Sequence, residues 1–195
     1  PAPEWNLERA ATAEPIQAAA SRMEVDMPVA APLFYYGYKC PVQGTAYRPA
    51  AELTAADVLL ELLAGKSSPL YARLLREGLI NASFGCQYFE GPGYASWLFG
   101  GESRDPDAVA AAIREEIGRL QRTRIPEEDF RMARNMVYGR LISALNDVEN
   151  CGDFLVSDYF YGRAPFNLID TAATLDIQSV YALLDGGFRP EAAAL

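Results

Sequence analysis

Two short alternating segments joined by a tight turn constrain the fold of this chain more than any other feature. Residues 83–88 alternate apolar with small or polar side chains, and residues 94–101 (YASWLFGG) follow the turn sequence Gly91-Pro92-Gly93. Strict alternation is typical of a half-buried strand, and a glycine- and proline-rich turn between two such segments predicts a β-hairpin. Because a hairpin pairs its strands in opposite directions, this part of the sheet is expected to be antiparallel.

Two more strands are expected in the N-terminal part. Residues 23–27 (MEVDM) alternate apolar and acidic side chains, and residues 32–40 are rich in aromatic residues and bounded by prolines. Since proline cannot donate a ladder hydrogen bond, Pro28 predicts a bend or a sheet edge between these two strands. Residues 23–40 and 82–99 are therefore expected to supply four strands of one antiparallel sheet.

The region between the two pairs of strands is predicted to be helical. Residues 51–64 carry leucine and valine at helical spacing, with Thr54 as the expected N-cap and Gly65 as the stop. A short second helix is expected to begin at Ser68, with Pro69 in its first turn, and to end at Gly78. Its inward face should carry Leu70, Leu74 and Leu75.

The C-terminal half is predicted to be helical as well. Helices are expected to start at Asp105-Pro106 and at Pro126, with an interruption at residues 150–154 (NCGDF) and a last helix over residues 175–184. Two pairs of strands with tight hairpins, followed by a run of helices, favour an α+β fold with an antiparallel sheet covered on one face by helices.

We expect residues 1–22, which are rich in alanine and proline, to form a lead-in segment, and residues 23–195 to form a single domain. The chain begins with Pro1 and has no signal-peptide pattern. We therefore expect it to be part of a longer protein.

Composition narrows the class of function. The chain has 17 basic and 26 acidic residues, a formal net charge of −9, and no basic cluster, so nucleic acid is not an expected partner. No apolar run approaches the roughly 20 residues of a membrane helix, so no membrane span is expected. Three cysteines without CxxC spacing predict neither a disulfide framework nor a structural zinc site. As buried small hydrophobic residues they fit a reducing compartment, which favours a cytoplasmic location.

The chain contains no histidine. This excludes Ser-His-Asp and Cys-His catalysis, histidine-ligated zinc and the usual proton shuttle at neutral pH. Catalysis by this chain would depend on carboxylates, lysine, tyrosine or a cysteine thiolate alone. We therefore expect it to lack a complete active site and to hold no cofactor.

Several other patterns have ordinary structural explanations. Gly65-Lys66-Ser67 resembles the end of a phosphate-binding loop, yet it follows a predicted helix where such a loop requires a strand. Acidic residues at the predicted helix starts complement the helix dipole better than they form a cation site. The aromatic segments 33–38 and 159–162 are more typical of core packing than of a peptide cradle.

Two longer segments carry a resemblance to a known family. These are GKSSPLYARLLREGLINASF (65–84) and the block that runs from FGGESRDPDAVAAAI (99–113) to RTRIPEEDFRMARNMVYGRL (122–141). Over residues 22–188 the chain resembles the pitrilysin/insulinase family of zinc peptidases, which includes the mitochondrial processing peptidases. In members of that family two homologous halves form a clamshell, and only the N-terminal half carries the inverted zinc motif HxxEH. The resemblance therefore implies that this chain has the half-clamshell fold of one such half. The chain resembles the zinc-less, C-terminal half.

The resemblance also implies candidate substrate-binding residues. The zinc-less half of the family usually supplies an arginine and a tyrosine that contact the substrate, because both side chains can donate hydrogen bonds to a developing oxyanion. Arg73 and Arg76 lie in the matching block, and Asn81 stands where the tyrosine is expected. This departure leaves the alternative open that the two arginines form a solvated helix face and that Asn81 is a turn residue.

Two functions follow as expectations from the resemblance. The chain would be the non-catalytic, substrate-chamber half of a zinc metallopeptidase, holding a peptide while a homologous half, in the same chain or a separate subunit, supplies zinc. The alternative is a non-proteolytic scaffold, or an inactive paralogue of the same fold. An HxxEH motif in the parent protein or in a partner subunit would distinguish the first function from the second.

The missing histidines lead to a first prediction. The purified chain should neither retain zinc at a 1:1 ratio after dialysis nor cleave quenched fluorescent peptides, because its residues provide no zinc ligand set. Metal analysis and a peptidase assay with and without a chelator measure both properties. Peptide cleavage that a chelator abolishes would contradict the prediction.

Overall fold

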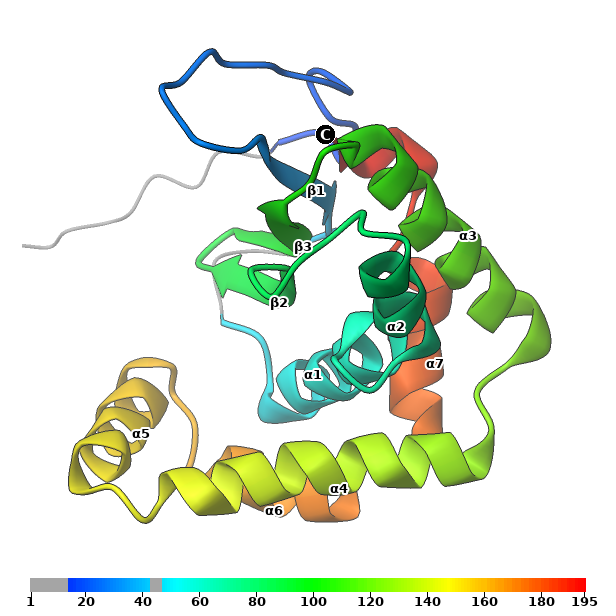
Figure 1. Cartoon of the computed structure of the whole chain (residues 1–195). Coiled ribbons are helices and arrows are strands. Elements are labelled where there is room, and N and C mark those ends of the chain that lie inside the picture. The colour runs from blue at the N-terminus through cyan, green and yellow to red at the C-terminus, as the bar shows by residue number, and fades with distance from the viewer. Residues whose placement is uncertain (1–13, 43–46) are drawn as a thin grey trace, which may run out of the picture.

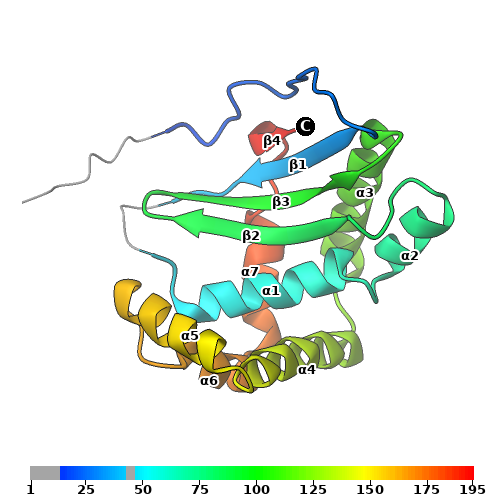
Figure 2. The same cartoon turned by 60° about the vertical axis from the view of Figure 1, so that its left-hand side comes forward.

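The computed structural model describes residues 14–42 and 47–195, so most of the expected lead-in segment lies outside the described residues. The described residues form a four-stranded antiparallel sheet with helices packed on one face (Figures 1 and 2). The expected α+β fold class is therefore confirmed. The strands are β1 (Leu33–Lys39), β2 (Gly85–Gly91), β3 (Tyr94–Glu102) and β4 (Ala193–Ala194), in the order β2-β3-β1-β4.

The helices follow the predicted order along the chain, with one addition. They are α1 (Ala50–Ala64), α2 (Pro69–Arg76), α3 (Pro106–Thr123), α4 (Glu127–Ala144), α5 (Val148–Phe160), α6 (Asn167–Thr174) and α7 (Ile177–Gly186). Helix α6 was not predicted, and α7 lies two residues later than the predicted last helix. No helix among the described residues is long and apolar enough to cross a membrane.

The predicted hairpin is formed by β2 and β3. Gly91 pairs with Tyr94 across the turn, and Gly93 adopts a positive φ of 87°, a conformation that glycine accepts without a steric penalty. Strand β3 pairs with β2 on one side and with β1 on the other, with Tyr36 opposite Phe99. The hairpin therefore supplies the central strand and one edge of the sheet.

The predicted signals at the ends of α2 are also confirmed. The Ser68 hydroxyl accepts a hydrogen bond from the Tyr71 N–H at 3.1 Å, and Pro69 occupies the first turn, where its missing N–H has no intrahelical partner. Gly78 follows the helix with a positive φ of 64°. These contacts direct the chain from α2 into β2.

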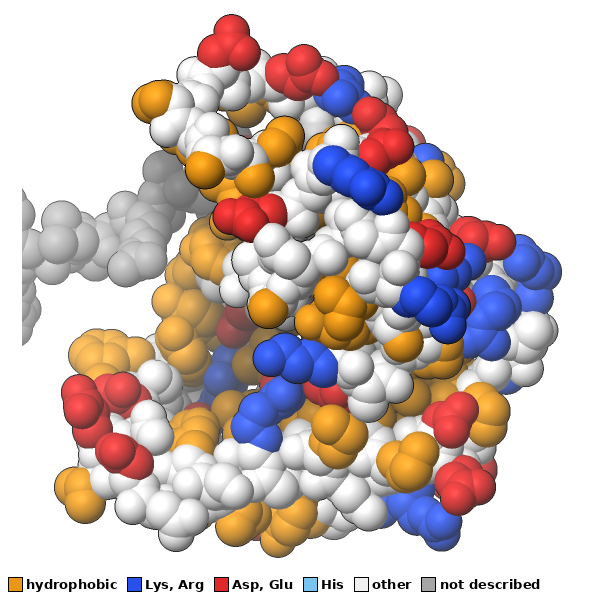
Figure 3. Space-filling view, in the orientation of Figure 1, with side chains coloured by type: hydrophobic (Ala, Val, Ile, Leu, Met, Phe, Trp, Pro, Cys, Tyr) orange, Lys and Arg blue, Asp and Glu red, His pale blue; other side chains and the backbone are white. Residues whose placement is uncertain are grey.

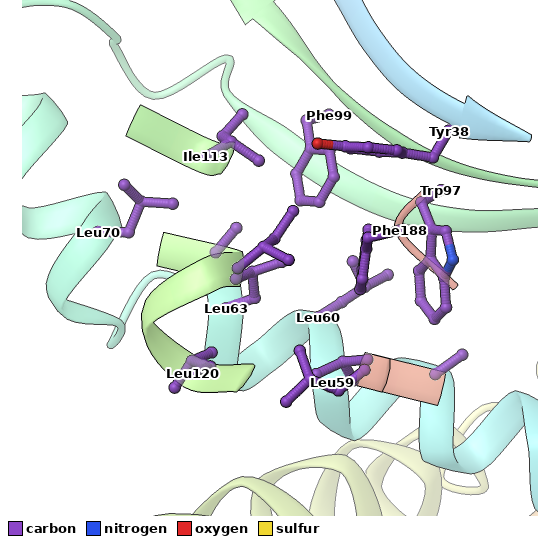
Figure 4. Packing of buried hydrophobic residues seen from close by; sticks show 14 of the residues in the cluster. Tyr38, Leu59, Leu60, Leu63, Leu70, Trp97, Phe99, Ile113, Leu120 and Phe188 are labelled. Atoms are coloured by element: carbon purple, nitrogen blue, oxygen red, sulfur yellow. The ribbon is translucent and has the colours of Figure 1, made fainter. Parts of the chain in front are cut away.

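The core lies between an aromatic face of the sheet and the helices (Figure 4). Trp97 and Phe99 of β3 are fully buried, and the alternate residues of β1 beside them are 5% exposed or less. The facing helices contribute buried aliphatic side chains. From α1 and α3 these include Leu59, Leu60, Leu63, Ile113 and Leu120. Burial of such side chains stabilises a fold by about 1.5–3 kcal/mol each.

The prediction of a strand over residues 23–27 is wrong. These residues form no strand, and their apolar side chains Met23, Val25 and Met27 are 64–79% exposed. The fourth strand is instead β4, which pairs with Gly37 and Tyr38 of β1. The outer edge of β1 is thus occupied by the far end of the chain, a non-local partner that local alternation does not reveal.

Three local predictions also need correction. Thr54 is not an N-cap but lies inside α1, where its hydroxyl donates to the Ala50 carbonyl at 2.8 Å. Leu75 is 47% exposed rather than inward. Residues 150–154 do not interrupt a helix but belong to α5, and the break falls at residues 145–147.

A buried ion pair ties the hairpin to the helical layer. Arg163, between α5 and α6, donates to a carboxylate oxygen of Glu90 on β2 at 3.0 Å and to the Arg48 carbonyl at 3.1 Å. The other carboxylate oxygen of Glu90 accepts the Arg48 N–H at 3.0 Å. The Arg163 and Glu90 side chains are only 6% and 11% exposed, so removal of either partner leaves a buried charge without compensation.

This ion pair gives a prediction on stability. Replacing Arg163 with alanine (Arg163→Ala) should lower the free energy of unfolding by about 3–5 kcal/mol, because the Glu90 carboxylate then stays buried without its cation. Urea denaturation followed by circular dichroism measures the change. The control, Arg131→Ala on the exposed face of α4, should change stability by about 0.5 kcal/mol or less. Equal effects of the two substitutions would contradict the structural role of the pair.

Candidate functional site

The second face of the sheet is open. Because side chains alternate along a strand, burial of Phe34, Tyr36 and Tyr38 against the helices turns Leu33 and Tyr35 outward. These two side chains are 57% and 71% exposed, and no described helix packs over them (Figure 2). Large apolar side chains on an uncovered sheet face are typical of a binding surface.

A shallow cavity lies in this open face. It has a volume of about 360 Å³ and is lined from three strands, with Tyr35 from β1, Gly85 and Gln87 from β2, and Leu98 and Gly100 from β3. Ser83, just before β2, contributes to its rim. We call this cavity the sheet trough. Its lining residues offer apolar carbon, the Gln87 amide and the hydroxyls of Tyr35 and Ser83.

Two glycines create the floor of the sheet trough. Gly85 and Gly100 lie directly opposite each other on β2 and β3, and Gly100 in turn lies opposite Tyr35. A Cβ atom at Gly85 would meet no atom within 4 Å, whereas one at Gly100 would lie 2.6 Å from the Tyr35 ring. The Tyr35 ring therefore rests over Gly100, while the space above Gly85 is free. Glycine leaves the strand backbone accessible at both positions.

Asn81 lies in the turn between α2 and β2 and orders the rim of the trough. Its side-chain oxygen accepts the N–H of Ser83 at 2.8 Å, and its amide nitrogen donates to Glu102 at 2.6 Å. The Ser83 hydroxyl in turn accepts the backbone N–H of Glu102 at 2.9 Å. This turn joins the exit of α2 to the end of β3.

The two candidate arginines occupy different environments on α2. Arg73 forms an ion pair with Glu115 of α3 at 3.2 Å, so its guanidinium faces the helical side. Arg76 is exposed, and no ion pair or hydrogen bond joins its side chain to another described residue. Of the three residues named from the sequence, the structure brings Asn81 beside the sheet trough, and neither arginine lines it.

Metal-ligating and nucleophilic side chains are dispersed or buried among the described residues. No group of three or more histidine, cysteine, aspartate or glutamate side chains in residues 14–42 and 47–195 comes close enough to hold a metal ion. Burial raises the pKa of the Cys40 and Cys86 thiols to about 12, so neither forms a thiolate nucleophile at neutral pH. A zinc ion therefore does not fit the residues present.

The sequence pattern of β1 contains a signal for the sheet trough. Residues 33–38 (LFYYGY) place apolar or aromatic side chains on both faces of one strand. One face must lie against the helices, so the other has to be covered by a further layer or remain open for binding. The role of Gly85 and Gly100 depends on the strand register, which places them opposite each other. The sequence alone does not provide this register.

The fold and this site define a class of domain: an antiparallel sheet covered by helices on one face and open on the other, with no metal-holding cluster among the described residues. Comparison with known proteins gives the family. The profile of the Peptidase M16 inactive domain matches residues 11–137. The chain thus belongs to the M16 family of zinc peptidases, in the pitrilysin/insulinase group, and corresponds to the zinc-less C-terminal half. The expectation from the sequence is confirmed on this point.

Individual relatives agree with this assignment. An uncharacterised zinc protease of Bacillus subtilis, YmfH, is 27% identical over 124 residues, which make up 64% of this chain and 29% of the relative. A putative M16-like peptidase from Alicyclobacillus acidocaldarius superposes with a TM-score of 0.85 at 26% identity, over 92% of this chain and 43% of that one. The inactive peptidase domain of a Bordetella parapertussis putative zinc protease shares the fold, with a TM-score of 0.64 at 17% identity, over 82% of this chain and 86% of that one.

The share of each relative that is matched differs. The chain spans less than half the length of the Bacillus and Alicyclobacillus proteins, and most of the length of the Bordetella domain.

The buried thiols lead to a prediction on pH. A folded-state pKa of about 12 exceeds the ordinary value of 9.0, so the stability gained by keeping Cys40 and Cys86 neutral is fully present below about pH 9. It is lost as the pH rises toward 12. Burial also raises the pKa of the Tyr38 and Tyr88 phenols, which strengthens the decline above pH 10.

Urea denaturation between about pH 7.5 and 10.5 should therefore show a falling free energy of unfolding. A Cys86→Ala variant should show a smaller fall than the unchanged chain, because one buried thiol no longer titrates. A free energy of unfolding that stays constant over this range would contradict the burial of these groups.

Proposed function

We propose that this chain is the substrate-chamber half of an M16-type zinc metallopeptidase. In this proposal a homologous half carrying HxxEH, in the same polypeptide or in a separate subunit, supplies zinc and the catalytic carboxylate. The observation that carries the proposal is the sheet trough: an open, partly apolar cavity on a domain whose own residues fit no metal. The domain then contributes binding energy and orientation, and the partner half contributes the chemistry.

The sheet trough fits one side chain of an extended peptide. An apolar side chain above Gly85 would contact Leu98 and Tyr35, and burial of such a side chain is worth about 1.5–3 kcal/mol. The Gln87 amide and the Ser83 hydroxyl can bond to the peptide backbone. In addition, β2 lies at one edge of the sheet, where no described strand pairs with its outer side, and an extended peptide can pair there.

The candidate residues on α2 and at the rim take separate roles in this proposal. Arg76, which is exposed, offers a charge-assisted hydrogen bond to a substrate carbonyl. Arg73 is held by Glu115 and must leave that ion pair to reach a substrate. Asn81 either contacts the substrate beside the trough or holds the trough rim in place. The second role agrees with its amide group, which already bonds to Ser83 and Glu102 in the turn.

The occupied amide of Asn81 favours the second candidate function. A tyrosine at this position could present a free hydroxyl, whereas Asn81 uses both of its amide atoms within the protein. A non-proteolytic scaffold, or an inactive paralogue, has no need of that donor. The absence of HxxEH from the parent protein and from any associated subunit would favour the scaffold over the peptidase.

The proposal predicts how filling the trough affects peptide binding. Gly85→Val should place its side chain in free space, so the protein should fold and keep its melting temperature, yet lose the cavity. A fluorescein-labelled peptide of alternating leucine and serine should bind this variant at least about tenfold more weakly, a cost of about 1.4 kcal/mol. Fluorescence anisotropy measures the dissociation constants.

A matched control separates the trough from a general effect of valine. Gly139 on α4 also has no atom within 4 Å of an added Cβ, and Gly139→Val should leave peptide binding unchanged. In the zinc-bearing parent, Arg76→Ala should lower kcat/KM by about a hundredfold while stability stays nearly unchanged. Equal peptide binding by the unchanged chain and Gly85→Val, with undiminished cleavage by the Arg76 variant, would refute the chamber role.

A further inference from the structure

Helix α5 carries its apolar stripe on the outside. Apolar residues recur along it at helical spacing, as on an amphipathic helix that faces a core. In this case the stripe is 44–88% exposed, and it consists of Val148, Leu155, Val156, Tyr159 and Phe160. The buried residue of α5 is instead Asp158, whose carboxylate accepts the Phe166 N–H at 2.8 Å. Helix α5 thus exposes five large apolar side chains beside its exposed acidic residues, while its inward side carries the half-buried Phe154 and the buried Asp158.

Few contacts attach α5 to the rest of the domain. At the C-terminal end, the Tyr161 ring packs on the Tyr47 ring at 4.3 Å, and Arg163 lies over Tyr161 at 4.7 Å. At the N-terminal end, the Cys151 thiol contacts the Leu145 carbonyl at 3.4 Å. No other described helix or strand packs extensively against α5, and Figures 1 and 2 show it at a corner of the helical layer. The stripe is thus held in a fixed place without being covered.

The charge of this region limits what can cover the stripe. Residues 141–162 contain Asp147, Glu149, Asp153 and Asp158 but no lysine or arginine, and Figure 3 shows acidic and hydrophobic side chains over α5. An anionic membrane surface would be repelled, as would a second copy of a chain with a net charge of −9. The complementary partner is a protein surface with an apolar groove and a neutral or basic rim.

We propose that the α5 stripe docks into such a groove on the zinc-bearing half, an inference that rests on the proposed function. More than half of the length of the Bacillus and Alicyclobacillus relatives lies outside the part that this chain matches, so each has a large further region available for contact. Five apolar side chains on one helix form a small interface. A groove of matching shape would bury these side chains together, as anchor residues at the centre of an interface.

The experiment measures binding between the two halves. The zinc-bearing half, recognised by HxxEH, is produced as a separate chain and titrated with this one in a calorimeter. A triple variant, Val156→Ser with Tyr159→Ser and Phe160→Ser, should bind about a hundredfold more weakly, because truncating exposed aromatic anchors removes contact energy at the interface. Its melting temperature should stay unchanged, since the three side chains are more than half exposed.

The control variant removes a similar apolar area elsewhere. Met23→Ser, Val25→Ser and Met27→Ser replace side chains that are 64–79% exposed, and binding should stay within about twofold. If the zinc-bearing half binds the α5 variant as tightly as the unchanged chain, the docking proposal alone is overturned. If no HxxEH-bearing half exists, both proposals are overturned. The unchanged chain is also tested for dimerisation by sedimentation and for binding to phosphatidylglycerol vesicles. If either occurs and the α5 variant abolishes it, the stripe belongs to that other partner and the docking proposal is overturned.

Discussion

The contact between the aromatic face of the sheet and α1 determines the arrangement of the rest of the domain. Trp97 is fully buried on this face, with its ring centroid 4.6 Å from that of Tyr88 in the sheet and 4.9 Å from that of Phe188, which follows α7. Its indole N–H is buried without a hydrogen-bond partner among the described residues, and Gly187 approaches it so closely that a Cβ would lie 2.7 Å away. Dense packing at this point fixes which face of the sheet is buried, and therefore which face is left open for binding.

The sequence predicts those parts of the fold that depend on local chemistry. The hairpin, the Ser68 cap and the glycine after α2 each follow from residues within a few positions of one another. The strand expected at residues 23–27 is not formed because β4, from the other end of the chain, pairs with β1 in its place. The segment itself meets the C-terminus only at Met23, whose N–H donates to the Leu195 carbonyl at 2.9 Å. Helix α6 is not predicted from the sequence because its N-cap residue, Phe166, has no side chain that can cap a helix. Phe166 instead adopts a left-handed backbone conformation.

The candidate site is harder to predict than the fold because it depends on register. The resemblance identified Arg73, Arg76 and Asn81 by their place in the chain, while the trough arises from glycines on neighbouring strands that come to lie opposite each other. The ion pair of Arg73 with Glu115 joins two different helices, so the sequence of either helix alone does not predict it. The missing histidines, by contrast, exclude a histidine-ligated metal centre without any structure, which agrees with assignment to the inactive domain.

The order of the strands has a consequence for biosynthesis. Strand β1 is made early, yet one of its two neighbours in the sheet is β4, at residues 193–194. At roughly 5–20 residues per second, β4 follows β3 from the ribosome after roughly 5–20 seconds, during which the outer edge of β1 has no strand to pair with. An unpaired edge flanked by exposed Leu33 and Tyr35 is an aggregation hazard for the nascent chain. The yield of soluble protein therefore depends on translation rate and chaperone supply as well as on the stability of the finished domain.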